Sequence, residues 1–158
     1  MYDFVFSDWI FEVKGTREKG RIHTINGLDQ LKTPSGKYIA LISFLATKSE
    51  GALSKSLQNW IEDIEKEFLN NRADLIERFY NLLAGCGYSR IHKEEYRKVK
   101  FDIYDGKFFT VNENFPKLTS DHLKQPLDSK VSEIQYTIDL EGLSGEVFEK
   151  IFLGKYFY

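Results

Sequence analysis

The sequence contains little that would place the protein outside the cell or in a membrane. Its 158 residues include one cysteine, Cys86, so no disulfide can form within the chain, and we expect a reducing, cytoplasmic environment. The longest apolar run, Tyr38–Ala46, is far shorter than the ~20 residues that a membrane-spanning helix needs. The first residues show no basic stretch followed by a plain apolar one, so we also expect no signal peptide.

An excess of charge of one sign is also missing. The 22 basic and 24 acidic side chains give a net charge of −2, which argues against a broadly basic nucleic-acid-binding surface but leaves room for a local cationic groove. A hydrophobic content of 42% together with 29% charged residues is typical of a soluble globular protein. Because 158 residues can bury a proper core, we expect one domain over residues 1–158.

The first fourteen residues predict a β-hairpin. Two apolar runs, Phe4–Phe6 and Trp9–Phe11, flank the polar pair Ser7-Asp8. A turn centred on that pair places opposite each other the residues whose numbers sum to fifteen, so that Asp3 faces Glu12. Because side chains alternate along a strand, Lys14 lies on the same side of the hairpin as both carboxylates.

Two facing carboxylates repel each other unless something compensates their charge. A divalent cation would do so, and a neighbouring lysine would suit the activation of water at that cation. The alternative is an ordinary hairpin with one solvated, charged face. Apolar residues on the opposite face, and Val5 and Ile10 beside the charges, indicate a hairpin covered on both sides, where an unpartnered carboxylate pair is costly. The residues alone leave both interpretations open.

The segment after the hairpin predicts three short elements. Gly15–Arg21 holds two glycines and several cations, and we interpret it as a solvated basic loop, with contact to a phosphate backbone as the alternative. Arg21–Ile25 alternates as a strand does, and His23 on its polar phase is expected to be exposed or hydrogen-bonded rather than a metal ligand. Leu28–Leu31 is expected to form one helical turn.

The rest of the chain predicts a central sheet, two helices and further strands. Tyr38–Ala46 reads as a strand buried on both faces. The other expected elements are a helix whose apolar stripe runs from Leu53 to Phe68, with Ser54 available as a cap, a helix over 72–84, a hairpin turning at Asp105-Gly106, a strand over 131–140 and a helix over 145–152. We therefore expect an α/β part over residues 1–87 and a β-rich part over residues 88–158.

A strand with an aspartate, a strand with Glu-x-Lys, and a buried strand after them resemble the PD-(D/E)XK nuclease superfamily. More narrowly, the chain is similar to an uncharacterised bacterial branch of that superfamily. The segments that carry the resemblance are Tyr2–Phe6, Phe11–Gly15, Ile25–Leu31, Gly85–Tyr88, Phe108–Pro116 and Tyr136–Leu140. They extend in order over nearly the whole chain.

The resemblance implies a restriction-endonuclease-like α/β fold (α+β mixed sheet), with a core sheet flanked by helices and a C-terminal antiparallel β appendage. It also implies a phosphodiesterase that depends on Mg²⁺ (or Mn²⁺). Asp3 and Glu12 would bind the metal and the carbonyl of Val13 would complete its ligands. Lys14 would orient or deprotonate the attacking water, and Gln30 would lie near the site on the next helix.

The expected activity is therefore that of a DNA endonuclease of restriction or phage-defence type. The alternative is a catalytically silent module with a nuclease fold that binds nucleic acid or protein. The family core normally begins with a helix and a strand before the aspartate-bearing strand, and Tyr2 stands where the family often has proline. We therefore expect either a missing N-terminal segment or a homodimer that covers the open edge of the sheet.

Overall fold

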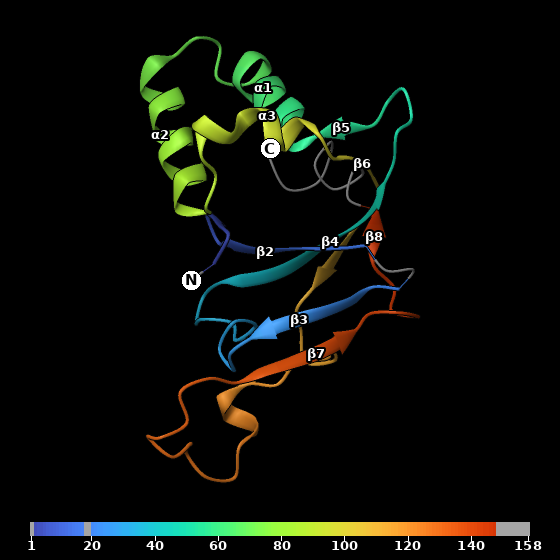
Figure 1. Ribbon diagram of the computed structural model, residues 1–158. Coiled ribbons are helices and arrows are strands. Elements are labelled where there is room, and N and C mark those ends of the chain that lie inside the picture. The colour runs from blue at the N-terminus through green and yellow to red at the C-terminus, as the bar shows by residue number, and fades with distance from the viewer. Residues whose placement is uncertain (1, 18–19, 148–158) are drawn as a thin grey trace. The chain divides into compact units, whose positions relative to one another are not determined.

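A computed structural model describes residues 2–17 and 20–147, and it has a mixed α/β architecture (Figure 1). The chain divides into two compact units. The first unit combines Met1–Ala46 with Ile103–Tyr158, and the second is Thr47–Asp102. The mixed α/β class predicted from the sequence is confirmed. The boundary predicted between residues 87 and 88 stays a prediction.

The main sheet of the first unit contains the hairpin at the start of the chain. Its strands, in spatial order, are β1 (Phe4–Phe6), β2 (Trp9–Thr16), β4 (Tyr38–Lys48) and β6 (Lys100–Thr110), with β8 (Glu146–Val147) paired to β6. The predicted hairpin register is confirmed, because β1 and β2 pair Phe4 with Phe11 and Phe6 with Trp9. Ser7 takes a φ of +50° in the turn between the two strands.

Strand β2 also pairs with β4, in parallel, from Trp9 opposite Tyr38 to Thr16 opposite Leu45. The prediction of a buried strand over Tyr38–Ala46 is confirmed, since the side chains of residues 39–43 are all buried. A strand enclosed on both faces needs apolar residues at consecutive positions, and this segment provides them. Strand β2 thereby lies between two neighbours, whereas β1 lies at the edge of the sheet.

The hairpin is covered on only one of its strands. Ile10, Phe11 and Glu12 of β2 are buried, but all three residues of β1 are exposed, with Val5 at 63%. The expectation that both faces of the whole hairpin are covered is therefore wrong for β1. An edge strand of three residues has too little neighbouring structure to bury its side chains.

A second, antiparallel sheet of the first unit pairs β3 (Ile22–Asn26) with β7 (Gln135–Asp139), and Figure 1 shows the two strands side by side. The strand predicted near Arg21–Ile25 is thus confirmed. Its buried phase carries His23 and Ile25, while Ile22 is exposed. The apolar core between the sheets joins residues of β2 and β4 to residues of β3 and β7, namely Ile10, Ile39, Leu41, Ile25 and Ile138.

The hairpin predicted at Asp105-Gly106 is wrong. Strand β6 runs through both residues without turning back, although Asp105 has a φ of +47°. The main-chain carbonyl and the carboxylate of Asp105 both accept from the guanidinium of Arg21. The positive φ of Asp105 therefore gives a local distortion within the strand, and the contact with Arg21 holds that distortion in place.

The second unit holds the helices α1 (Leu57–Glu67), α2 (Ala73–Gly85) and α3 (Lys93–Arg97), a 3₁₀ turn over Arg90–His92, and β5 (Lys55–Ser56) paired with the start of β6. Both long predicted helices are present. The cap of the first is not Ser54 but Ser56, whose hydroxyl accepts from the backbone N–H of Asn59 in a capping box. The hydroxyl of Ser54 instead donates to Asp102, 2.7 Å away.

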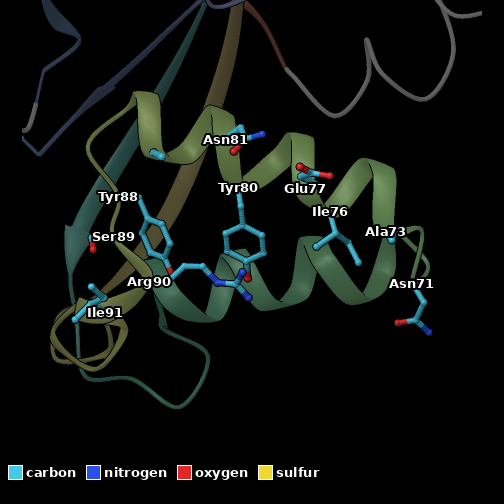
Figure 2. Close-up of a pocket in the computed structure, with 11 residues that line it drawn as sticks. Asn71, Ala73, Ile76, Glu77, Tyr80, Asn81, Tyr88, Ser89, Arg90 and Ile91 are labelled. Atoms are coloured by element: carbon cyan, nitrogen blue, oxygen red, sulfur yellow. The ribbon is translucent and has the colours of Figure 1, made fainter.

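The second unit also contains an open groove of about 720 Å³ along one side of α2 (Figure 2). The guanidinium of Arg90 lies over the ring of Tyr80, 4.0 Å from its centroid. Burial, together with a 2.7 Å hydrogen bond to Glu65, raises the pKa of Tyr80 to about 12. No residue proposed from the sequence for the active site lines this groove.

Two expectations concern the remaining segments. The strand predicted over residues 131–140 is present in its second half as β7, and a 3₁₀ turn covers Ser120–His122. The start of the helix predicted over residues 145–152 is wrong, because Glu146–Val147 form β8. The part of this prediction from residue 148 onward lies outside the described residues. Within the described ranges, no helix has the length and apolar character required to cross a membrane.

Candidate active site around Glu12

Glu12 is a buried carboxylate at the centre of the main sheet. Its side chain is 2% exposed and shares a face of β2 with Ile10, opposite Leu41 in the parallel ladder. Because this face packs toward β3 and β7, burial raises the pKa of Glu12, while the hydrogen bond and the charge of Lys14 lower it. The net shift is upward, so the fold holds the charged form of Glu12 at a cost.

The two oxygens of Glu12 have different surroundings. Oε1 accepts from Nζ of Lys14 at 2.8 Å and from Nε2 of Gln30 at 2.6 Å. Oε2 is enclosed and has no hydrogen-bond partner among the described residues. A buried carboxylate oxygen without a donor is unfavourable, and such atoms are rare in folded proteins. One half of this carboxylate is thus satisfied by the protein, and the other half lacks a partner.

Asp3 approaches the same region from the edge strand. It precedes β1, so the ladder begins one residue after the predicted pair with Glu12. Its Oδ2 accepts from the backbone N–H of Val13 at 2.8 Å, which ties the exposed carboxylate to β2. After burial and Lys14, the charge of Asp3 is a further influence on the pKa of Glu12, and it raises that pKa. The predicted repulsion between the two carboxylates is therefore present.

Lys14 and Gln30 complete the group that the sequence predicted. Lys14 lies two residues beyond Glu12 on the same face of β2, and its side chain is 17% exposed. Gln30 reaches Glu12 from the segment after β3, where its Oε1 accepts from the backbone N–H of Asn26 at 2.7 Å. Leu28–Leu31 forms a hydrogen-bonded turn, in which the N–H of Lys32 donates to the carbonyl of Asp29, and Gln30 lies in this turn rather than on a helix. Gln30 nonetheless lies where a residue near the site was expected.

Three buried polar residues lie beside this group, and the sequence interpretation missed two of them, Arg21 and Ser43. Arg21, placed in the solvated basic loop, is 4% exposed, and Ser43, placed in the apolar strand, is 0% exposed. His23 is 3% exposed and is hydrogen-bonded to Ser43, so the hydrogen-bonded alternative is the correct one. Two signals in the sequence point to them: Arg21 and His23 share the phase of Ile25, and Ser43 interrupts an apolar run.

The oxygen ligands present fit a hard divalent cation that needs few ligands from the protein. Across residues 2–17 and 20–147 there is no cluster of three or more His, Cys, Asp or Glu side chains, which excludes a cage made of side chains alone in that part of the chain. Mg²⁺ is usually bound by one or two carboxylates together with waters and phosphate oxygens. Asp3 and the unpartnered oxygen of Glu12 supply that number of carboxylates.

Comparison with models of known protein families gives a match over most of the chain. A family model described as "Putative PD-(D/E)XK family member, (DUF4420)" matches residues 1–141. This range includes all four residues of the group around Glu12 and every described strand except β8. Neither the curated proteins nor the solved structures yield a match.

Proposed function

Because this chain belongs to the DUF4420 family of PD-(D/E)XK-like proteins, we propose that it is a metal-dependent phosphodiesterase that hydrolyses the backbone of nucleic acid. DNA is the proposed substrate, and an endonuclease of restriction or phage-defence type is the proposed class. Mg²⁺, or Mn²⁺ in its place, is the proposed cofactor. Net charge argues against a broadly basic surface, so substrate contact would be local to the site.

One observation carries the proposal: Oε2 of Glu12 is buried without a donor, while Oε1 has two. A residue retained only for stability would be better as an apolar side chain or as a fully bonded one. A cation at Oε2 would remove the deficit. It would also offset the repulsion from Asp3, which raises the pKa of Glu12.

The proposed roles follow from these positions. Asp3 and Glu12 hold the cation, with the carbonyl of Val13 as a further ligand. Gln30 holds Oε1 of Glu12 and thereby fixes the direction of the carboxylate. When bound, the cation supplies charge neutralisation at the phosphate and lowers the pKa of a bound water.

Lys14 is the proposed catalytic residue. Its ammonium group lies 2.8 Å from Glu12 and retains 17% exposure, so it is held beside the carboxylate while remaining accessible from solvent. An ammonium group offers three donors. One binds Glu12, and the others are available to orient the attacking water and to stabilise negative charge on the phosphate. The role requires the ammonium and water to meet at hydrogen-bonding distance.

The test combines metal binding with cleavage. Calorimetry with MgCl₂ and with MnCl₂ is expected to show binding to the native protein that Asp3→Asn and Glu12→Gln remove and that Glu50→Gln, at an exposed carboxylate, leaves unchanged. Lys14→Ala is expected to bind Mn²⁺ and to lose cleavage of plasmid and oligonucleotide DNA. A well-folded protein that binds neither ion would overturn the proposal.

The catalytically silent binding module remains the second candidate, and the exposed edge strand favours it. Phe4 is 63% exposed and Phe6 is 54% exposed, so β1 offers apolar side chains at an edge where another chain can pair. A homodimer through this edge is the corresponding proposal. Light scattering would detect the dimer. Nucleic-acid binding that survives Asp3→Asn and Glu12→Gln and needs no metal would favour this candidate over the enzyme.

A further inference from the structure

A second polar group lies beside Lys14, on the face between the two sheets of the first unit. Lys14 and Ser43 are partners in the parallel ladder of β2 and β4, so their side chains share one face. Going along each strand, this face is apolar at one end, at Ile10 and Ile39, and polar at the other. At the polar end, the Ser43 hydroxyl forms hydrogen bonds with Arg21 and His23.

The hydrogen bonds that Arg21 makes within this group have a defined direction. Nη1 of Arg21 donates to the carbonyl and to Oγ of Ser43, each at 2.7 Å. A guanidinium can only donate, so the Ser43 hydroxyl accepts from Arg21 and keeps its own proton for another acceptor. Nε2 of His23 lies 2.8 Å from that hydroxyl. Which of these two atoms donates the hydrogen bond depends on the tautomer of the imidazole.

The charges of the group are arranged around Lys14. Nη2 of Arg21 forms an ion pair with Oδ2 of Asp105 at 2.8 Å, which pairs that carboxylate with Arg21. Burial, the charge of Arg21 and then the charge of Lys14 together lower the pKa of His23 to about 4, so the imidazole is neutral at neutral pH. Toward Ser43, the face beside Lys14 therefore carries a hydroxyl, a neutral ring and a cation. Glu12 is the carboxylate that binds its ammonium group.

Stability does not account for such a group. A buried charge carries a large desolvation cost, and apolar residues of similar volume often serve the fold as well or better. Fully bonded buried networks do fix the positions of the elements that contribute to them. Here the network links three strands. Ser43 of β4 binds Arg21 and His23 of β3, and Arg21, which precedes β3, also binds Asp105 of β6.

We propose that Arg21, Ser43 and His23 are positioning residues for Lys14. They fix the end of β4 against β3 beside Lys14, so that its ammonium group is held on Glu12 and points toward the metal site and the attacking water. This inference rests on the proposed phosphodiesterase function. It assigns a role in that reaction to three residues that do not touch the substrate.

The test uses Ser43→Ala, which removes the hydroxyl at the centre of the network with little change in volume. His23→Gln is the second variant. Thr24→Val, at an exposed position of β3, is the matched control. In cleavage of plasmid DNA with MgCl₂, kcat is expected to fall by about 10- to 100-fold in both variants and to stay unchanged in the control. Mg²⁺ affinity by calorimetry is expected to stay within about twofold, as is typical of changes that leave the ligands intact.

A second measurement does not depend on activity. Proton-detected ¹⁵N NMR follows the exchange of the Lys14 ammonium protons with water, which is expected to be several times faster in Ser43→Ala than in the native protein. If the native protein cleaves nothing but exchange is faster in the variant, the positioning role stands and the proposed function falls. If a folded Ser43→Ala variant keeps both kcat and the native exchange rate, the positioning role is overturned. An equal loss of Mg²⁺ affinity and kcat would also overturn it.

Discussion

Nζ of Lys14 lies 2.8 Å from Oε1 of Glu12, and both residues project from the same face of one central strand. The spacing of two residues along a strand produces this contact directly, because alternate side chains share a face. Glu12 is the more buried partner, at 2% exposed against 17% for Lys14. Lys14 thus stabilises a carboxylate that burial alone would disfavour.

Replacement of Lys14 by alanine is expected to raise the pKa of Glu12 further. Burial already raises that pKa, and the hydrogen bond and charge of Lys14 are the influences that lower it most. Carbon-13 NMR titration of the Glu12 carboxyl group measures the change. Lys124→Ala, at an exposed lysine far along the chain, serves as the control. A Glu12 pKa that is equal in the two variants would contradict the assigned ion pair.

Replacement of Glu12 by glutamine is expected to stabilise the metal-free protein by about 1 kcal/mol, the size of gain that relief of a strained functional site often gives. The raised pKa of Glu12 means that folding disfavours its charged form, and glutamine keeps the shape without the charge. Urea unfolding at pH 7 in the presence of EDTA measures the difference. Glu50→Gln, at an exposed glutamate, should leave the midpoint where it is. A lower midpoint for Glu12→Gln would show that the charge stabilises the fold.

His23 is expected to make the protein less stable in mild acid. Its pKa is about 4 in the folded protein against 6.5 as the ordinary value. Between these values the unfolded chain binds a proton that the folded protein does not, so the free energy of unfolding falls as the pH is lowered from 6.5 to 4. Above pH 6.5 the imidazole is neutral in both states, and the stability is not reduced. The two values correspond to about 3 kcal/mol.

The measurement for His23 is urea unfolding at several pH values in the native protein and in His23→Gln. The groups that act on the imidazole are the cations Arg21, directly before β3, and Lys14 of β2, with the Ser43 hydroxyl as its hydrogen-bond partner. The native protein is expected to lose more stability between pH 6.5 and 4 than the variant does. Parallel curves for the two proteins would refute the assignment of a neutral buried histidine.

Replacement of Gln30 by alanine is expected to cost about 1 to 2 kcal/mol of stability, because it removes one hydrogen bond to a buried carboxylate and one to the backbone of Asn26. Metal affinity should fall as well, since Glu12 loses one of the two donors that orient it. Thermal unfolding and calorimetry with MnCl₂ measure the two effects. Gln125→Ala, at an exposed glutamine, is the control, and identical behaviour of the two variants would exclude an orienting role for Gln30.

The parts that the sequence predicted well are those decided by local alternation. The register of the first hairpin follows from two apolar runs around Ser7-Asp8. Because β2 is paired on both sides, the alternation along the strand then determines which face carries the side chain of Glu12. The buried strand β4 follows from a continuous apolar run. The helix α2 follows from its apolar stripe and the glycines after it.

The parts that were missed depend on partners distant in sequence. Asp105-Gly106 has the residues of a hairpin turn, but Arg21, 84 positions earlier, binds Asp105 and the strand continues. Ser54 has the chemistry of a helix cap, but Asp102 accepts its hydroxyl. Arg21 itself looked solvated because its four acceptor groups, the carbonyl and hydroxyl of Ser43 and the carbonyl and carboxylate of Asp105, lie on other strands. Such pairings are not visible in a local window of residues.

The two carboxylates of the candidate site belong to strands of very different local stability. Glu12 lies on a strand hydrogen-bonded on both sides, whereas Asp3 precedes a three-residue edge strand whose side chains are all exposed. Backbone amides of β2 should therefore exchange with deuterium only when the whole sheet opens, while those of β1 exchange through local fraying. An ion bound by both carboxylates would tie β1 to β2 and suppress the local fraying of β1. Slower amide exchange in β1, with unchanged exchange in β2, would then report that the site has been assembled.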